Sequence, residues 1–575
     1  MMRICCCLLL LTSLTSGAEV PPLVQQAEQE RINTINEIAP AVVAIFAAGG
    51  QGGGSGVLVS ADGWAVTNFH VVQGQGGFMQ CGLNDGQVYW AVLAGIDPTG
   101  DLAMIKLQGR DDFPHAKIGD SDKVRMGDMT FALGNPFLLA TDLQPTVTYG
   151  MVSGTHRYQY PAGTFLEYTD CIQVDTSINP GNSGGPLFNA TGELIGINGR
   201  ISVEKRGRVN VGAGYAISIN QVMNFLDHLK SGRIVDHATL GATVSSLSDG
   251  TVVVRNILER SPAFRRGLRS NDELISFAGR PIRSVNQFKN ILGIYPKGWT
   301  LPLSYQRDGE RFDINVRLMA LHRRAELGGG ASDDPEPEQP PEDPDGDDEE
   351  APPPLTPPHG MMERPVLDIP EEYKQMFEEK IGFANFYFNE QAQQRLLKAA
   401  DWGDFQEAWA LTGKAGDGLP VQFRIQSDAV AAKIGDAVSL QPLDEDFVDE
   451  PEGTGGFLAA LYQLQQFLID PNEYFTEFYY LGSEPLAATG ERVDVLYSTR
   501  GLVQCRWYFT KEAEPRFLGF DCFLEEDLDP CEIRFDQVES MGDVRFPRQM
   551  TVNHQDKTMQ LVFDSLSFYT PKEKP

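Results

Sequence analysis

The chain has 575 residues, of which 42% are hydrophobic and 10% aromatic, and its formal net charge is −32. This composition excludes a fibrous or wholly disordered protein, and the length allows several domains with buried cores. Nucleic-acid binding needs clustered lysine and arginine to neutralise phosphates, so the acidic balance argues against that class of partner.

The N-terminal residues have the order of an export signal. One arginine precedes a short apolar run, which ends in the small residues Ser16-Gly17-Ala18. This pattern predicts a signal peptide over residues 1–18. The apolar run is shorter than the roughly 20 residues that span a bilayer, which argues against a membrane anchor. A lipoprotein signal at Cys5, Cys6 and Cys7 stays open. We therefore expect an exported protein, either periplasmic or extracellular.

Residues 19–234 predict a first folded domain built from β-strands. Short β-branched runs such as GVLVS, LAMIKL and ELIGING are separated by Gly, Asn and Asp, which is typical of a barrel or sandwich. Apolar residues recur at helical spacing over residues 220–231, so a helix should close this domain. Residues 235–325 predict a compact α/β domain with a helix near Val285–Leu292.

Residues 326–365 are rich in proline and acidic residues and predict a disordered linker, because they cannot bury enough apolar surface to offset their ordering entropy. Residues 366–575 form a third domain of the α+β class. Helical patterns cover residues 371–400 and the run GFLAALYQLQQFLI, and repeated strand signals near the C-terminus predict an antiparallel sheet. The predicted fold is therefore mainly β.

Five cysteines remain outside the signal: Cys81, Cys171, Cys505, Cys522 and Cys531. In the hairpin formed by GLVQCRWYF and FLGFDCFL, Cys505 and Cys522 are equidistant from the turn, so the two should lie opposite each other across the strands. We predict a disulfide between them. Two free buried cysteines, or a bond from either to Cys531, remain alternatives. No sequence pattern supports a metal site.

Three residues in separate motifs predict a nucleophilic serine centre. A serine attacks an amide carbonyl only if a base takes its proton, a third group orients that base and fixed donors receive the developing charge. Ser183 lies in INPGNSGGPL, His70 ends the apolar run AVTNFHVV, and Asp101 begins DLAMIKL. Their order and their separations of 31 and 82 residues fit a double β-barrel in which the three meet at a cleft.

Each motif also has an ordinary structural explanation, as a glycine turn, a hydrogen-bonded histidine or a turn aspartate. Three such residues in this order at strand boundaries are hard to explain as turns alone. We predict the oxyanion hole at Gly181, Asn182 and Ser183, where the tight glycine turn frees the backbone N–H groups of Gly181 and Ser183 to point at one spot.

The segments TNFHVV, DLAMIKL, ALGNPF, IQVDTSINPGNSGGPLFN, GELIGING and GAGYAI follow one another as they do in HtrA-family proteases. The resemblance implies a chymotrypsin-like double barrel, a peptidase that needs no cofactor, and a homotrimer or larger homo-oligomer. Phe69 replaces the asparagine that commonly precedes the histidine in this family, while the three expected catalytic residues are kept.

The resemblance also implies a primary specificity pocket for small or medium aliphatic side chains. The residues expected to line it are Ser177, Ile178, Gly212, Ala213, Gly214 and Tyr215. Ser177 stands where a tryptic pocket would have an acidic residue, so a basic side chain would have no buried partner.

The second domain resembles a PDZ domain in the segments TLGATV, SPAFRRGLRSNDELISFAGRPI and YQRDGE. The resemblance implies capture of a peptide C-terminus by strand addition, with Leu240, Gly241 and Ala242 as the carboxylate loop. A PDZ fold used only for packing is the alternative. The third domain resembles LolA-like lipoprotein carriers in its helices followed by the meander FDQVESMGDVRFPRQMTVNHQDKTMQLVFDSLSF. A substrate-recruiting, envelope-binding or structural role fits it equally well.

These features predict an exported, ATP-independent serine endopeptidase that degrades unfolded or damaged proteins and recognises peptide C-termini through its PDZ-like domain. The alternative is a peptide-binding chaperone or scaffold that keeps the protease fold but cannot assemble its oxyanion hole. The intact set of His70, Asp101 and Ser183 favours the enzyme.

Overall fold

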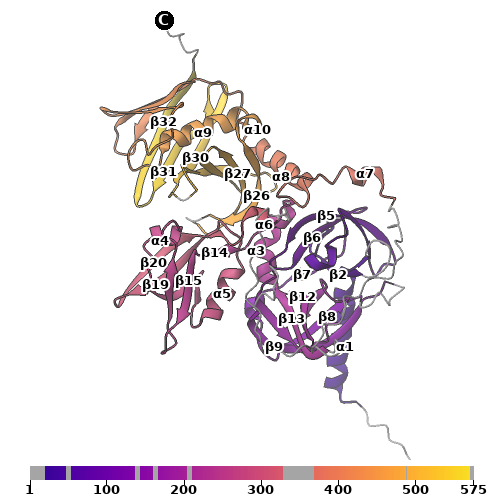
Figure 1. The fold of residues 1–575 in the computed structure, drawn as a ribbon. Helices are drawn as coiled ribbons and strands as arrows, with labels where there is room; N and C mark the ends of the chain where they lie inside the picture. Colours follow the sequence, from indigo (N-terminus) through magenta and orange to yellow (C-terminus); the bar gives the residue numbers. More distant parts are fainter. Residues whose placement is uncertain are drawn as a thin grey trace, which may run out of the picture.

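The computed structural model describes residues 20–46, 53–135, 143–159, 166–179, 181–203, 210–327, 368–486, 489–526 and 528–569. The predicted signal peptide and most of the predicted linker lie outside these residues. The described chain forms three folded units, which Figure 1 shows in indigo to purple, in magenta to pink, and in orange to yellow. None of the described helices is long and apolar enough to cross a membrane.

The first unit begins with α1 (Pro22–Ile38) and a closed barrel. The barrel strands pair in the order β1-β2-β3-β6-β5-β4, and their interior is filled by aliphatic side chains. Their bounds are β1 Val42–Phe46, β2 Gly53–Leu58, β3 Trp64–Thr67, β4 Phe78–Gly82, β5 Val88–Asp97 and β6 Leu102–Leu107. The short helix α2 (Phe69–Val72) follows β3.

The second barrel of this unit contains β7 Lys117–Ile118, β8 Met129–Gly134, β9 Thr146–Gln159, β10 Tyr168–Val174, β11 Pro186–Asn189, β12 Glu193–Val203 and β13 Asn210–Ser218. Pairing of β11 with β12 closes the ring β11-β8-β9-β10-β13-β12. The helix α3 (Ile219–Lys230) ends the unit, as its apolar spacing predicted. The predicted double barrel is confirmed.

The second unit is a small sheet with the order β15-β16-β17-β19-β20 and two helices against it. Its elements are β14 Ala238–Thr239, β15 Ala242–Ser246, β16 Val252–Ile257, α4 Pro262–Arg265, β17 Glu273–Phe277, β18 Arg280–Pro281, α5 Val285–Gly293, β19 Thr300–Arg307, β20 Glu310–Arg317, β21 Met319–Ala320 and α6 Arg324–Leu327. Because β15 is an edge strand, one of its sides is open for pairing among the described residues.

The third unit is an antiparallel sheet of 11 strands in the order β25-β24-β23-β22-β32-β31-β30-β29-β28-β27-β26. The strands are β22 Trp409–Ala415, β23 Pro420–Ile425, β24 Ala429–Ile434, β25 Ala437–Pro442, β26 Glu477–Pro485, β27 Arg492–Arg500, β28 Val503–Phe509, β29 Phe517–Phe523, β30 Cys531–Met541, β31 Val544–His554 and β32 Lys557–Phe568. The apolar helix α9 (Phe457–Ile469) packs in its core, and α10 (Pro471–Tyr474) follows.

The helical pattern over residues 371–400 is divided into α7 (Glu371–Lys374) and α8 (Phe386–Ala399). Gly382 lies between them with a φ of 86°, a conformation that favours glycine and ends helical structure. The separation lets Phe377 contact Phe78, and Phe388 contact Trp64, on the first barrel.

The predicted Cys505–Cys522 disulfide is absent from the structure, although its strand register is confirmed. Cys505 pairs with Cys522 across β28 and β29, and Cys522 pairs in turn with Cys531 across β29 and β30. All three are buried free thiols. The hairpin symmetry places Cys505 opposite Cys522, but this position alone does not require a bond between their sulfurs. Both thiols pack in the hydrophobic core as small apolar groups.

All three units contact α3, which lies at their meeting point (Figure 1). The Asn224 amide donates to the carbonyl of Ile294 in the second unit at 2.9 Å. On the third unit, the Nε2 of His228 lies 3.1 Å from the carbonyl oxygen of Ser483. Burial lowers the pKa of His228 to about 3, so this imidazole is neutral and donates one hydrogen bond across the interface.

Candidate active site

His70, in the short helix α2 that follows β3, and Asp101, directly before the neighbouring strand β6, form a close pair in the first barrel. The Nδ1 of His70 lies 2.8 Å from one carboxylate oxygen of Asp101 and 3.0 Å from the other, and the His70 backbone N–H donates to the same carboxylate. Asp101 is 1% exposed, whereas the His70 side chain is 46% exposed. The imidazole is therefore fixed on one side and open on the other.

Local backbone contacts hold Asp101 in an unusual conformation. Its φ is 57°, in the left-handed region that residues other than glycine rarely adopt. Its carbonyl oxygen accepts hydrogen bonds from the Asn68 side chain at 2.9 Å and from the Phe69 backbone at 3.2 Å. The turn before α2 thus positions both members of the pair.

Tyr168, the first residue of β10, supplies another donor to the buried carboxylate. Its hydroxyl donates to Asp101 at 2.5 Å, and the side chain is 2% exposed. Asp101 consequently accepts hydrogen bonds from both barrels. This arrangement satisfies a buried charge that would otherwise be costly.

The electrostatics of the pair favour a basic imidazole. Burial alone disfavours the charged form of His70, but the hydrogen bond to Asp101 and the carboxylate's charge outweigh it, and the pKa of His70 is raised. A histidine with this environment suits general-base chemistry near neutral pH.

Ser183 lies on the turn between β10 and β11, against the His70 turn. At Gly184 a Cβ would lie 2.3 Å from the Thr67 hydroxyl and 3.0 Å from the Asn68 backbone nitrogen, so only glycine allows this approach. Among the described contacts, the Ser183 hydroxyl makes its hydrogen bond with the carbonyl of Gly199, at 3.4 Å, and not with His70.

The predicted oxyanion turn is held from the other barrel by Ser55. The Ser55 hydroxyl donates to the Gly181 carbonyl at 2.6 Å, and its backbone N–H donates to the Ser183 carbonyl at 2.9 Å. Gly181 has a φ of 103°. The backbone N–H groups of Gly181 and Ser183 have no acceptor within the described part of the protein, whereas Asn182 N–H donates to Asn179 at 2.9 Å.

The side chain of Asn182 is fully buried, and neither its amide nitrogen nor its amide oxygen has a hydrogen-bond partner within the described chain. Unsatisfied buried amides are unfavourable, so this turn stores free energy in the conformation seen here.

The residues expected to form the specificity pocket lie on β13 and in the segment that follows its partner strand, β10. A Cβ on Gly214 would lie 2.6 Å from the Ile178 side chain, so these two residues are packed together. Ser177 is exposed, and its carbonyl accepts a hydrogen bond from Thr148 at 2.8 Å. Ala213 and Tyr215 are half-buried on β13, which also contains Gly212.

The residues expected to bind a peptide carboxylate lie at the start of the free-edged strand. Leu240 is buried, Gly241 has a φ of 70° in the turn between β14 and β15, and Ala242 begins β15. A Cβ on Gly241 would lie 2.8 Å from the Ser261 side chain, so the turn is packed tightly.

Comparison with known families agrees with this architecture. A trypsin-like peptidase domain model matches residues 54–197, and a PDZ domain model matches residues 238–318. The chain carries a trypsin-like peptidase domain and a PDZ domain. Both matches fall within the first two units, and the His70, Asp101 and Ser183 positions all lie inside the trypsin-like match.

Similar proteins share these two domains. The periplasmic serine endoprotease DegP of Escherichia coli (strain K12) is 36% identical over 297 residues, which cover 48% of this chain and 60% of that protein. A probable DegP-like periplasmic serine endoprotease of Marinomonas sp. (strain MWYL1) is 37% identical over 279 residues, 46% of this chain and 57% of that protein. The chain thus spans little more than half the length of these curated relatives.

Among solved structures, the HtrA-type protease AlgW with a tripeptide is 30% identical, with a TM-score of 0.42, and the match covers 51% of this chain and 98% of that one. A serine endoprotease from Yersinia pestis is 28% identical, with a TM-score of 0.37, over 51% and 98% of the two chains.

Two residues of the trypsin-like domain that contact the site were not singled out from the sequence. Ser55 is one of several small residues in a glycine-rich run, and Tyr168 begins a strand with no motif around it. Their contacts depend on how the two barrels meet, which no local pattern encodes.

Proposed function

We propose that this protein is an exported, cofactor-independent serine endopeptidase of the HtrA type that cleaves unfolded or damaged polypeptides. The observation that carries the proposal is the buried Asp101 carboxylate, which holds the Nδ1 of His70 at 2.8 Å beside the glycine turn of Ser183. The names of the relatives support a periplasmic location. Light scattering would test the homotrimer or larger homo-oligomer that the family resemblance implies.

In the proposed reaction, the Nε2 of His70 takes the proton of the Ser183 hydroxyl while the oxygen attacks the peptide carbonyl. The imidazolium is stabilised by Asp101, which also fixes its orientation. The N–H groups of Gly181 and Ser183, on either side of Asn182, receive the oxyanion. His70 then protonates the leaving amine, and water activated by the same histidine hydrolyses the acyl-enzyme.

The conformation described above is a resting form in this proposal. The Ser183 hydroxyl has to leave the Gly199 carbonyl before it donates to His70. The unpartnered amide of Asn182 makes the resting turn less favourable, so a small input of binding energy suffices to rearrange it. Bound substrate supplies that energy by contacting the turn and the neighbouring residues of β13.

The second proposal is a peptide-binding chaperone that keeps the protease fold. It is favoured by the hydrogen bond between the Ser183 hydroxyl and the Gly199 carbonyl, which would block catalysis if the turn never rearranged. In both cases the open edge of β15, with the turn at Leu240, Gly241 and Ala242, takes an extended peptide C-terminus by strand addition.

The test measures casein cleavage and labelling by a serine-directed phosphonate in the mature protein, in Ser183→Ala and in the control Ser60→Ala. Ser60 is a turn serine of the first barrel whose hydroxyl donates to Asp62. We expect labelling and cleavage by the wild type and by Ser60→Ala only, with stimulation by peptides that end in an apolar residue. Absence of both from the folded wild type, with and without peptide, would reject the peptidase in favour of the chaperone.

A further inference from the structure

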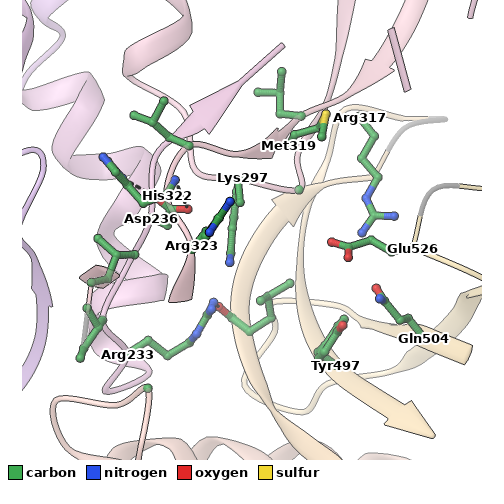
Figure 2. A pocket seen from close by; sticks show the side chains of 18 of the residues that line it. Arg233, Asp236, Lys297, Arg317, Met319, His322, Arg323, Tyr497, Gln504 and Glu526 are labelled. Atoms are coloured by element: carbon green, nitrogen blue, oxygen red, sulfur yellow. Dashed lines mark hydrogen bonds and ion pairs between the residues drawn. The ribbon is translucent and has the colours of Figure 1, made fainter. Parts of the chain in front are cut away.

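A large cavity lies where the three units meet, away from the proposed catalytic centre. Its volume is about 780 Å³. Its walls come from the connection between α3 and β14, from the end of β20 through β21 to α6, and from strands β26 to β28 of the third unit (Figure 2). The volume lies within the range of about 300–1,000 Å³ that is typical of ligand sites.

The cavity is rich in cations although the whole chain has a net charge of −32. Six basic side chains line it, namely Arg233, Arg260, Lys297, Arg317, Arg323 and Arg506, against four carboxylates. Two of those carboxylates already have partners close by. Asp236 lies 3.0 Å from the His322 ring, and Glu326 accepts the backbone N–H of Arg323 at 2.7 Å.

Two of the lining cations are Arg317, on β20, and Arg260, an exposed residue of the connection between β16 and α4. Within the described part of the chain, neither has a carboxylate at ion-pair distance. The Arg317 guanidinium lies 4.1 Å from the centre of the Phe523 ring. Burial, together with the nearby Arg506 cation, lowers the pKa of Arg317 to about 10, so its surroundings disfavour its charge.

Arg506 adds an unsatisfied donor at the same junction. It is 6% exposed, pairs with Glu484 and donates to the Gly298 carbonyl at 3.0 Å. Its Nε, however, has no hydrogen-bond partner in the described part of the chain. A buried donor without an acceptor is unfavourable. An anion bound in the cavity would lower the free energy of the closely spaced Arg317 and Arg506 cations.

The cations are spread along the cavity rather than gathered at one point. Figure 2 shows Arg233, Lys297 and Arg323 on one side, with Arg317, Gln504 and the carboxylate of Glu526 on the other. Aliphatic and aromatic residues, including Met319 and Tyr497, line the same space. A single small anion would reach only one of the two groups. An extended ligand with several separated charges would reach both.

We propose that this cavity binds an acidic peptide segment, with carboxylates of the peptide paired to the guanidinium groups of Arg260 and Arg317. Guanidinium groups bind carboxylates through two parallel hydrogen bonds, which gives them selectivity for such ligands. The PDZ wall of the cavity comes from the connection between β16 and α4, which contains Arg260, and from the end of β20 through β21 to α6. No residue of β15, the proposed peptide edge, lines it. The site does not depend on the proposed proteolysis.

The peptide has two possible sources. One is a bound polypeptide, and the other is this chain's own sequence between Asp333 and Glu350, which contains 11 carboxylates and no basic residue. That run begins six residues after Leu327, which lines the cavity. A tethered ligand so close in sequence has a high effective concentration.

The experiment uses the full-length mature chain with Ser183→Ala, so that no probe is cleaved. A fluorescein-labelled peptide with the sequence DDPEPE and a neutral control, NNPQPQ, are titrated by fluorescence anisotropy. We expect the acidic probe alone to bind, and its affinity to fall about tenfold or more in Arg260→Gln/Arg317→Gln. The control Arg311→Gln removes an exposed arginine from the same strand, β20, and should bind as the parent does.

Thermal unfolding and circular dichroism establish that each variant is folded, and Arg317→Lys should bind with intermediate affinity. Deletion of residues 333–350 distinguishes the sources: tighter probe binding identifies the chain's own run as the occupant, and unchanged binding identifies an external peptide. The proposal is overturned if the folded double variant binds as well as the parent. It is also overturned if tripolyphosphate binds at these arginines while the acidic peptide does not.

Discussion

Removal of one hydroxyl group should reveal how the two barrels of the peptidase domain cooperate. In Tyr168→Phe, the buried Asp101 carboxylate loses a donor at 2.5 Å, while both hydrogen bonds from His70 remain. A hydrogen bond to a charged group contributes about 1.5–3 kcal/mol. Because two donors to Asp101 remain, we expect Tyr168→Phe to lose about 1.5 kcal/mol of unfolding free energy, the lower end of this range. This loss lowers the folding equilibrium constant roughly tenfold.

The same variant should change the pH dependence of the proposed catalysis. Without the tyrosine, more of the carboxylate's charge acts on the imidazole, so the pKa of His70 rises further and the acidic limb of kcat/KM moves to higher pH. Urea unfolding and a pH–rate profile measure the two effects. In the control Tyr89→Phe, an exposed hydroxyl is lost from Asp85, and little change is expected. An unaltered stability and pH profile in Tyr168→Phe would refute the reasoning.

Three further predictions concern the interfaces and the core. Burial disfavours the charged form of His237, but the charge of Asp97 and its hydrogen bond to the imidazole outweigh burial and raise the pKa of His237. The stabilising effect of this pair is therefore complete below pH 6.5 and is lost as pH rises through the higher native pKa. Urea unfolding midpoints should fall between pH 6 and pH 9, and should fall less in His237→Gln. Arg506→Ala leaves Glu484 buried without its partner and should cost about 3–5 kcal/mol of unfolding free energy, partly recovered in the double alanine variant. The thiols of Cys505 and Cys522 are both buried, and burial raises the pKa of Cys505, so both should react with iodoacetamide only after unfolding, as mass spectrometry would detect.

Each of these expectations has an outcome that contradicts it. A pH-independent midpoint would show that the interface histidine contributes nothing to stability. Equal unfolding free energies for Arg506→Ala and the parent would mean that the ion pair is solvated. A mass 2 Da below that of the reduced chain, together with resistance to alkylation after unfolding, would establish a disulfide.

The sequence predicted those parts of the structure that are encoded locally. The alternation of the strands, the apolar spacing of α3 and α9, and the position of Asp101 just before a strand all follow from residues near one another in the chain. His70, expected at the end of a strand, instead lies in the short helix α2 that follows β3. The register of Cys505 opposite Cys522 followed from the symmetry of one hairpin.

Other features could not be predicted because they depend on contacts between distant segments. Neither the hydroxyl of Tyr168 nor that of Ser55 belongs to a motif, and each finds its partner only when the second barrel closes. The Ser183 hydroxyl bonded to Gly199 rather than to His70 is a property of one conformation, which residue identity does not specify. Likewise, opposed cysteines do not reveal whether their sulfurs are joined.

The central position of α3 has a consequence for anyone who shortens this chain. The Nε1 of Trp299 in the PDZ domain and the Nε2 of His228 in α3 both lie 3.1 Å from the carbonyl oxygen of Ser483. A recombinant fragment that ends after the PDZ domain would leave both donors facing solvent or one another, and would uncover the apolar surface around them. The trypsin-like and PDZ domains should therefore be purified, crystallised and assayed together with the C-terminal domain.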